Sequence, residues 1–172
     1  MSTSLLIHIL QFALAINISN ADAATIIHES KQYKFDPLLT SAIVYKESQF
    51  QNVLCYMGAH GLMQVQVPVH NCGKHSYYLA EAMNLYSIRG NLKEGLRLAQ
   101  YWKQWCKRNN HMHHWLLHFN QGFGHCNLPA KRCKYKDREV ITTGIRGGYP
   151  QRVLYIYNKL KRAKRLIKMG IV

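Results

Sequence analysis

Acidic residues are scarce in this chain, whose 172 residues include eight Asp and Glu against 23 Lys and Arg. The formal net charge of +15 predicts a polyanionic partner, such as nucleic acid, an anionic membrane surface or an acidic cell-wall polymer. Internal repeats and low-complexity linkers are missing too. Hydrophobic residues make up 48% of the chain, which excludes wholesale disorder and predicts one globular domain with a real core.

Runs of alternating polar and apolar residues, the usual sign of strands, are almost absent as well. Helical patterns instead cover residues 24–34, 36–48, 76–86, 91–106, 111–119 and the segment from 150 toward the end. The second helix has the clearest start, because Asp36 is a favourable N-cap and Pro37 suits the first helical position. We therefore expect a mainly α single domain with at most a small β-hairpin, among residues 55–75 or in the loop 126–147.

The five cysteines lack the Cys-x-x-Cys spacing of a zinc ribbon. In an oxidising compartment up to two disulfides could form and leave one thiol. Cys126 and Cys133 flank a short basic loop and are the easiest pair to close. The alternative is that most of the five are small, buried apolar side chains.

The N-terminal segment lacks Lys and Arg, yet it otherwise has the pattern of an export signal. The apolar stretch LLIHILQFALAINI is followed by ADA at 21–23, the small-residue pattern that a signal peptidase accepts. We expect a signal peptide over 1–23, with the mature domain over 24–172. The stretch is too short and too polar for a comfortable membrane span. The alternative is an N-terminal helix that packs on the domain or stays as an anchor.

One of the few carboxylates, Glu47, stands at the end of an apolar helical segment, DPLLTSAIVYKES. Leu39, Ile43 and Glu47 are spaced by four residues and therefore lie on one helix face. We expect Leu39 and Ile43 to face the core and Glu47 to emerge half-sheltered where this face ends. Burial disfavours a charged carboxylate, and a carboxylic acid that keeps its proton can protonate a leaving oxygen. The alternative is an ordinary ion pair with Lys46 or another base.

Four segments, the first of which begins at Glu47, occur in a consistent order along the chain. They read ESQF (47–50), GAHGLMQV (58–65), HFNQGFG (118–124) and GYPQRVLYIY (148–157). This series resembles the soluble-type lytic transglycosylases, a lysozyme-like family, and NLKEG (91–95) is similar to the start of the family's middle helix. The resemblance covers about residues 30–160. It implies a lysozyme-like, α-rich domain, and the residues of the last helix predict that this domain ends in a basic helix.

The resemblance further implies that the substrate is the glycan of peptidoglycan, cleaved between N-acetylmuramic acid and N-acetylglucosamine. Glu47 would protonate the glycosidic oxygen and then act as base on the C6 hydroxyl of the muramic residue, which closes a 1,6-anhydro ring. Most glycosidases need a second carboxylate beside the bond. Few acids remain after export to supply it: Glu29, Asp36, Glu81, Glu94, Asp137 and Glu139. None follows Glu47 at a family-like position, and this shortage fits a one-acid mechanism.

The resemblance also gives roles to other residues. Tyr149 would hold the carboxyl of Glu47 in place. The sugar contacts would come from Ser48, Met63, Gln64, Phe119 and Asn120. The amide of a glutamine can both donate to and accept from an N-acetyl or hydroxyl group. No cofactor is implied.

Three positions depart from the family pattern. Phe119 replaces the usual Tyr, His118 replaces a small residue, and Cys55 stands where Ser is common. We expect these differences to alter affinity or sugar choice rather than to abolish the chemistry.

A metal site is the first competing interpretation. His111, His114 and His118 share one helix face, but no HExxH motif or nearby carboxylate accompanies them. We expect no metal and a solvated, mildly basic face there.

The basic end of the last helix, KLKRAKRLIK, supports two other interpretations. It could bind nucleic acid or an anionic membrane surface, although no nucleic-acid motif accompanies it. The alternatives to a transglycosylase are thus a hydrolytic lysozyme of the same fold and a non-enzymatic cationic module that binds wall or nucleic acid. Our main expectation is an exported, monomeric enzyme of the periplasm or cell envelope, or one secreted or carried by a phage. It would act on peptidoglycan strands, in wall turnover or for a secretion, conjugation or phage apparatus.

Overall fold

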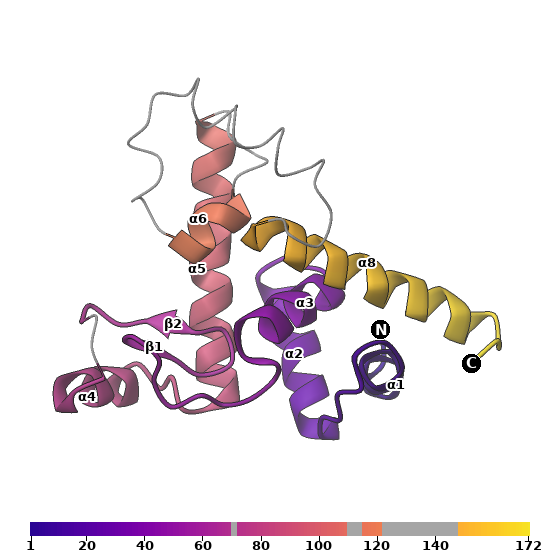
Figure 1. Cartoon of the computed structure of the whole chain (residues 1–172), viewed down its shortest axis with the longest axis horizontal. Coiled ribbons are helices and arrows are strands. Elements are labelled where there is room, and N and C mark those ends of the chain that lie inside the picture. Colours follow the sequence, from indigo (N-terminus) through magenta and orange to yellow (C-terminus); the bar gives the residue numbers. More distant parts are fainter. Residues whose placement is uncertain (70–71, 110–114, 122–147) are drawn as a thin grey trace. The chain divides into compact units, whose positions relative to one another are not determined.

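The computed structural model describes residues 1–69, 72–109, 115–121 and 148–172. These residues are mainly helical with one small antiparallel sheet, which confirms the expected fold class (Figure 1). The elements are α1 (Thr3–Leu14), α2 (Asn20–Gln32), α3 (Pro37–Ser48), β1 (Ala59–His60), β2 (Val65–Gln66), α4 (Lys74–Ala82), α5 (Ile88–Arg108), α6 (Trp115–Gln121) and α8 (Tyr149–Lys168). None of the helices in these ranges has the length and apolar character needed to cross a bilayer.

The described chain forms two compact units. The first consists of Met1–Arg97 together with Ile156–Val172, and the second of Leu98–Tyr155. Helices α5 and α8 therefore each contribute residues to both units.

The core of the first unit begins with three consecutive helices, since α1 packs on α2 and α2 packs on α3. Its largest fully buried side chains come from elements far apart in sequence: Leu6, Ile9, Leu10, Ile26, Leu38, Ile43, His60, Met63, Leu85, Leu92, Leu96 and Leu160. Such a core depends on long-range packing rather than on any single amphipathic helix.

Helix α1 lies within the segment expected to be a signal peptide. Leu6, Ile9 and Leu10 are completely buried, which is the arrangement that the packed-helix alternative expects. The next helix begins at Asn20 instead of residue 24, because the Ser19 side chain caps it by accepting from the Asp22 amide at 3.1 Å. Cleavage after residue 23 stays a prediction.

Helix α3 begins as predicted. The Asp36 carboxylate accepts from the Leu38 amide at 3.0 Å, and Pro37 is the first helical residue. The same carboxylate accepts from the Tyr157 hydroxyl of α8 at 2.8 Å. Burial, followed by this hydrogen bond, raises the pKa of Tyr157 to about 12. Asp36 thus fixes both the start of α3 and the position of α8 in the first unit.

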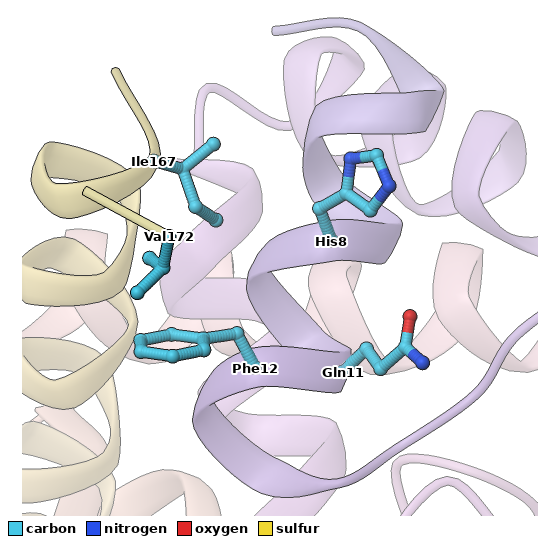
Figure 2. Close-up of a pocket in the computed structure, with 5 residues that line it drawn as sticks. All are labelled: His8, Gln11, Phe12, Ile167 and Val172. Carbon is cyan, nitrogen blue, oxygen red and sulfur yellow. The ribbon is translucent and has the colours of Figure 1, made fainter. Parts of the chain in front are cut away.

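The end of α8 is a Schellman motif. The Ile171 amide donates to the Leu166 carbonyl at 3.1 Å, the Gly170 amide donates to the Ile167 carbonyl at 3.1 Å, and Gly170 has a φ of +67°. Figure 2 shows Ile167 and Val172 directed toward Phe12 of α1. They line a cavity of about 400 Å³ together with His8 and Gln11.

The second unit has an aromatic core. His118 of α6 is buried and stacks on Trp102 of α5, with ring centroids 5.1 Å apart. Trp105 meets the same imidazole edge-on at 5.3 Å. The expectation of a solvated histidine face is therefore wrong for His118, while His111 and His114 lie outside the described residues. Cys106 is also buried, and this burial raises the pKa of its thiol to about 11.

Candidate functional site

Glu47 is the penultimate residue of α3 and is half-buried, as its helix face predicted. Ile43, one turn earlier, is completely buried, whereas Leu39 is only partly so. The chain leaves the helix abruptly, since Gln49 and Phe50 have φ values of 52° and 64°. Two successive non-glycine residues in the left-handed region are costly and are kept only where surrounding structure requires them. The carboxylate therefore stands at a fixed helix end.

Ser48 follows Glu47 and is buried. Its hydroxyl donates to the Val44 carbonyl within α3 at 3.2 Å. In this geometry the Ser48 hydroxyl is bonded within its own helix and does not point its donor outward.

The segment after α3 connects Glu47 to the small sheet through backbone hydrogen bonds. The Gln51 amide donates to the Ser48 carbonyl at 2.9 Å, and the Gly61 amide donates to the Val53 carbonyl at 2.7 Å. Strands β1 and β2 pair antiparallel in the predicted hairpin region, with His60 opposite Val65. The helix end and the GAHGLMQ turn thus belong to one hydrogen-bonded structure.

Gln64 ends that turn and is half-buried, with a φ of 47°. Its side-chain Nε2 donates to the Gly61 carbonyl at 2.8 Å, so the amide is held in one orientation. Gly61 itself has a φ of +73°, and a methyl group there would meet the side chain of Asn91 and lie 2.8 Å from the Leu85 carbonyl. Only glycine fits both the backbone and the space.

Asn91 of α5 is completely buried and forms hydrogen bonds to the turn. Its Oδ1 accepts from the Met63 amide at 2.8 Å, and its Nδ2 donates to the His60 carbonyl at 2.8 Å and to the Leu85 carbonyl at 3.1 Å. Met63 is buried too, with its side chain against Gly95. The sequence singled out Asn91 and Gly95 by resemblance alone, and the structure gives each a physical role.

Four of the other five described acids have partners or positions elsewhere. Glu29 is buried and pairs with Arg89, whose Nε lies 3.0 Å from Oε1. Glu94 pairs with Arg97 in the same helix. Asp36 caps α3, and Glu81 lines a separate pocket. Asp137 and Glu139 lie outside the described residues.

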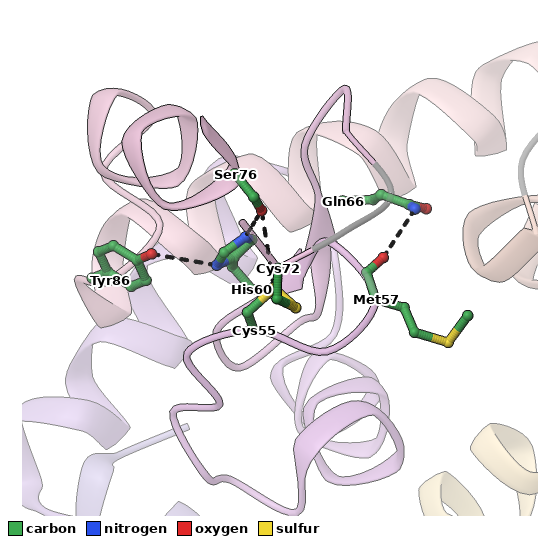
Figure 3. Close-up of a disulfide and its surroundings, with 7 residues drawn as sticks. All are labelled: Cys55, Met57, His60, Gln66, Cys72, Ser76 and Tyr86. Atoms are coloured by element: carbon green, nitrogen blue, oxygen red, sulfur yellow. Dashed lines mark hydrogen bonds between the residues drawn. A yellow bond between two sulfur atoms is a disulfide. The ribbon is translucent and has the colours of Figure 1, made fainter. Parts of the chain in front are cut away.

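A second cluster, missed in the sequence, surrounds the disulfide Cys55–Cys72 (Figure 3). His60 is completely buried, and its Nε2 shares a hydrogen bond of 2.8 Å with the Ser76 hydroxyl. Its Nδ1 lies 3.5 Å from the Tyr86 hydroxyl. Desolvation by burial is the main cause that raises the pKa of Tyr86. No local motif marks these residues, although a histidine inside a glycine-rich turn is a signal worth following. The predicted partners Cys126 and Cys133 lie outside the described residues.

The remaining predicted residues belong to the second unit. On α6, Phe119 is half-buried and Asn120 is exposed. Tyr149 is the first residue of α8 and is buried. Ser48, Met63, Gln64 and Glu47 belong to the first unit. The roles of Tyr149, Phe119 and Asn120 toward Glu47 or sugar stay predictions.

No family model, curated protein or solved structure matches the chain.

Proposed function

We propose that this protein is a lytic transglycosylase that cleaves peptidoglycan between N-acetylmuramic acid and N-acetylglucosamine. The observation that carries the proposal is that the end of α3, which bears the half-buried Glu47, is joined through backbone hydrogen bonds to the turn that holds the oriented amide of Gln64. Catalysis of glycoside cleavage needs such a fixed acid beside groups that can position a sugar.

In the proposed mechanism Glu47 gives its proton to the glycosidic oxygen as the bond to C1 of the muramic residue breaks. The resulting carboxylate then removes the proton of the C6 hydroxyl, which attacks C1 and forms the 1,6-anhydro ring. The same group serves as acid and base, so its proton is returned at the end. The engagement of Glu29, Asp36 and Glu94 in other contacts supports a one-acid scheme.

The sugar contacts that this proposal places in the first unit come from the turn. Gln64 would face the N-acetyl or hydroxyl groups with its amide oxygen, because Nε2 is held by Gly61. Met63 is buried, so it would act by shaping the turn rather than by touching the sugar.

The partner and location follow from the same proposal. The substrate would be peptidoglycan strands in the cell envelope. Six basic residues in the last helix would favour an anionic wall: Lys159, Lys161, Arg162, Lys164, Arg165 and Lys168. We expect the enzyme to act for a secretion, conjugation or phage apparatus.

Product analysis tests the activity. Isolated peptidoglycan is treated with the purified chain, and the released muropeptides are identified by mass spectrometry. We expect anhydro-muramic ends, each one water lighter than a reducing end. Reducing ends alone would instead assign a hydrolytic lysozyme. Binding to the wall with no cleavage by the parent chain would assign a non-enzymatic cationic module.

The role of Glu47 is tested by Glu47→Gln, which keeps the size and polarity of the side chain but removes its proton. We expect cleavage to fall at least about 100-fold, the usual scale for loss of a general acid. Glu94→Gln is the matched control, since Glu94 pairs with Arg97 on the surface of α5. Equal cleavage by the two variants would remove Glu47 from the mechanism.

A further inference from the structure

A second pocket lies in the first unit, on α4 and the segments beside it. It has a volume of about 500 Å³, within the range of small-ligand sites. Its lining residues, which we call the tyrosine pocket, are Leu54, Lys74, Tyr77, Tyr78, Glu81 and Tyr86.

Four of these residues form one stripe of α4. Lys74, Tyr77, Tyr78 and Glu81 have the spacing i, i+3, i+4 and i+7, which places them on the same helix face. An aromatic stripe at this spacing normally packs into a core. Here Tyr77 is 40% exposed and Tyr78 is 67% exposed, while the buried residues of the helix are Ser76 and Ala80 on another face. The tyrosine rings are therefore presented to solvent, which is the usual mark of a binding surface.

The walls of the pocket are held in place. His60 packs edge-on against the rings of Tyr77 and Tyr86, at centroid distances of 5.9 and 5.8 Å. The Asn52 side chain donates to the Tyr86 carbonyl at 3.1 Å, and the disulfide Cys55–Cys72 joins the segment after Leu54 to the start of α4. A pocket prepared in this way loses little conformational entropy when a ligand binds.

The chemistry of the lining indicates the ligand class. Tyrosine rings are neutral at pH 7 and offer flat apolar faces with a hydroxyl at the edge. The charges of Lys74 and Glu81 cancel, so the pocket is neutral in a chain whose net charge is +15. Because Glu81 balances Lys74, the lining offers no net positive charge to a phosphate or an anionic lipid. A neutral ligand rich in hydroxyl and amide groups, with C–H faces that stack on aromatic rings, fits all of these features.

We propose that the tyrosine pocket binds an N-acetylhexosamine oligosaccharide, with a sugar ring on Tyr78. The hydroxyls of Tyr77 and Tyr86 and the side chains of Lys74 and Glu81 would pair with its hydroxyl and acetamido groups. This site is separate from Glu47. The choice of an N-acetylhexosamine rests on the proposed function, whereas a neutral sugar-like ligand follows from the pocket.

The test is an NMR-monitored titration of the full chain with triacetylchitotriose. The chain carries Glu47→Gln so that the sugar stays intact. We expect saturable binding that weakens at least fivefold in Tyr78→Ala and is retained in Tyr78→Trp. Tyr155→Ala is the matched control, because Tyr155 is 61% exposed on α8 and lies outside the pocket. It should bind as the Glu47→Gln parent does.

Absence of saturable binding would overturn the proposal. Equal affinity of the Tyr78→Ala and Tyr155→Ala variants would overturn it as well. A DNA oligonucleotide whose binding depends on Tyr78 while chitotriose does not bind would assign the pocket to nucleic acid and also overturn it. Wall cleavage that survives Glu47→Gln would reject the proposed mechanism and leave a Tyr78-dependent sugar site standing.

Discussion

The side chain of Asn91 accepts a hydrogen bond from the backbone amide of Met63 at 2.8 Å, although the two residues are 28 positions apart. Through this bond, helix α5 fixes the turn that carries Gln64. The geometry of the candidate site therefore depends on a buried residue that need not touch a substrate.

Asn91→Ala should destabilise the protein strongly. It would leave the Met63 amide and the carbonyls of His60 and Leu85 without their buried partner. Because each unsatisfied buried group costs ~1–3 kcal/mol, we expect a loss of ~3 kcal/mol in the free energy of unfolding, measured by urea denaturation. Asn109→Ala is the control, since the Asn109 side chain donates to the Trp105 carbonyl near the exposed end of the same helix. Similar losses in both variants would contradict the role given to Asn91.

Gly95→Ala should lower the melting temperature. Replacing glycine by alanine inside a helix normally gains ~0.5–1 kcal/mol. Here the added methyl would lie 2.5 Å from Met63 Sδ and 2.7 Å from Met63 Cβ. We expect overpacking of ~1–3 kcal/mol to reverse the sign. Gln104→Ala, at an exposed position of α5, should have little effect, and a melting temperature raised by Gly95→Ala would refute the close contact.

Loss of the disulfide should destabilise the hairpin region. The bond Cys55–Cys72 closes a loop with a sequence separation of 17, for which the chain-entropy estimate is ~3 kcal/mol. Cys55→Ser, Cys72→Ser and the double variant should lose the same amount, because each removes the same bond. Additive losses in thermal denaturation would show that the two cysteines act independently. Peptide mapping after alkylation without reductant gives a direct check, since both thiols should be unlabelled in the parent.

Stability should fall as the pH rises above about 10, in part through Tyr157. The folded pKa of about 12 lies above the unfolded value of 10.0, so the unfolded chain releases this proton first. Below pH 10 both states keep the proton and Tyr157 adds no pH dependence. Between pH 10 and 12 deprotonation favours the unfolded state. Melting temperatures should therefore decline less steeply in Tyr157→Phe than in the parent, whereas Tyr155→Phe should follow the parent. Parallel declines in all three proteins would disprove the contribution of Tyr157.

A comparison of the predicted and observed helix ends shows which ends the sequence could predict. The start of α3 was predicted correctly, because an Asp cap followed by proline is a local signal. The helix expected over 76–86 instead covers Lys74–Ala82, because Asn84 takes a φ of 56° and the Leu85 amide donates to the Ala80 carbonyl. The helix expected from 91 starts at Ile88, where the Ser87 hydroxyl accepts from the Gly90 amide. Serine is a favourable N-cap, so the start at Ile88 had a local signal that the sequence analysis missed, whereas the end at Ala82 depends on an asparagine in the left-handed conformation.

Contacts between distant segments could not be predicted from periodicity. The Glu29–Arg89 pair and the stacking of His118 on Trp102 depend on how helices approach one another, which a single helix pattern does not contain. The half-buried position of Glu47 did follow from its own helix face. The proposed chemistry at Glu47 stays a prediction until its products are identified.

The first unit is formed by two separate segments of the sequence, and this affects the order in which the protein can fold. Residues 98–155 are synthesised between the two parts of that unit, and the Tyr157 hydroxyl meets Asp36 across 121 positions. Helices α1 to α3 therefore leave the ribosome long before their last partner exists. The first unit can therefore complete its packing only after the last helix has been synthesised, and until then the apolar surface of the unfinished helices is open to aggregation.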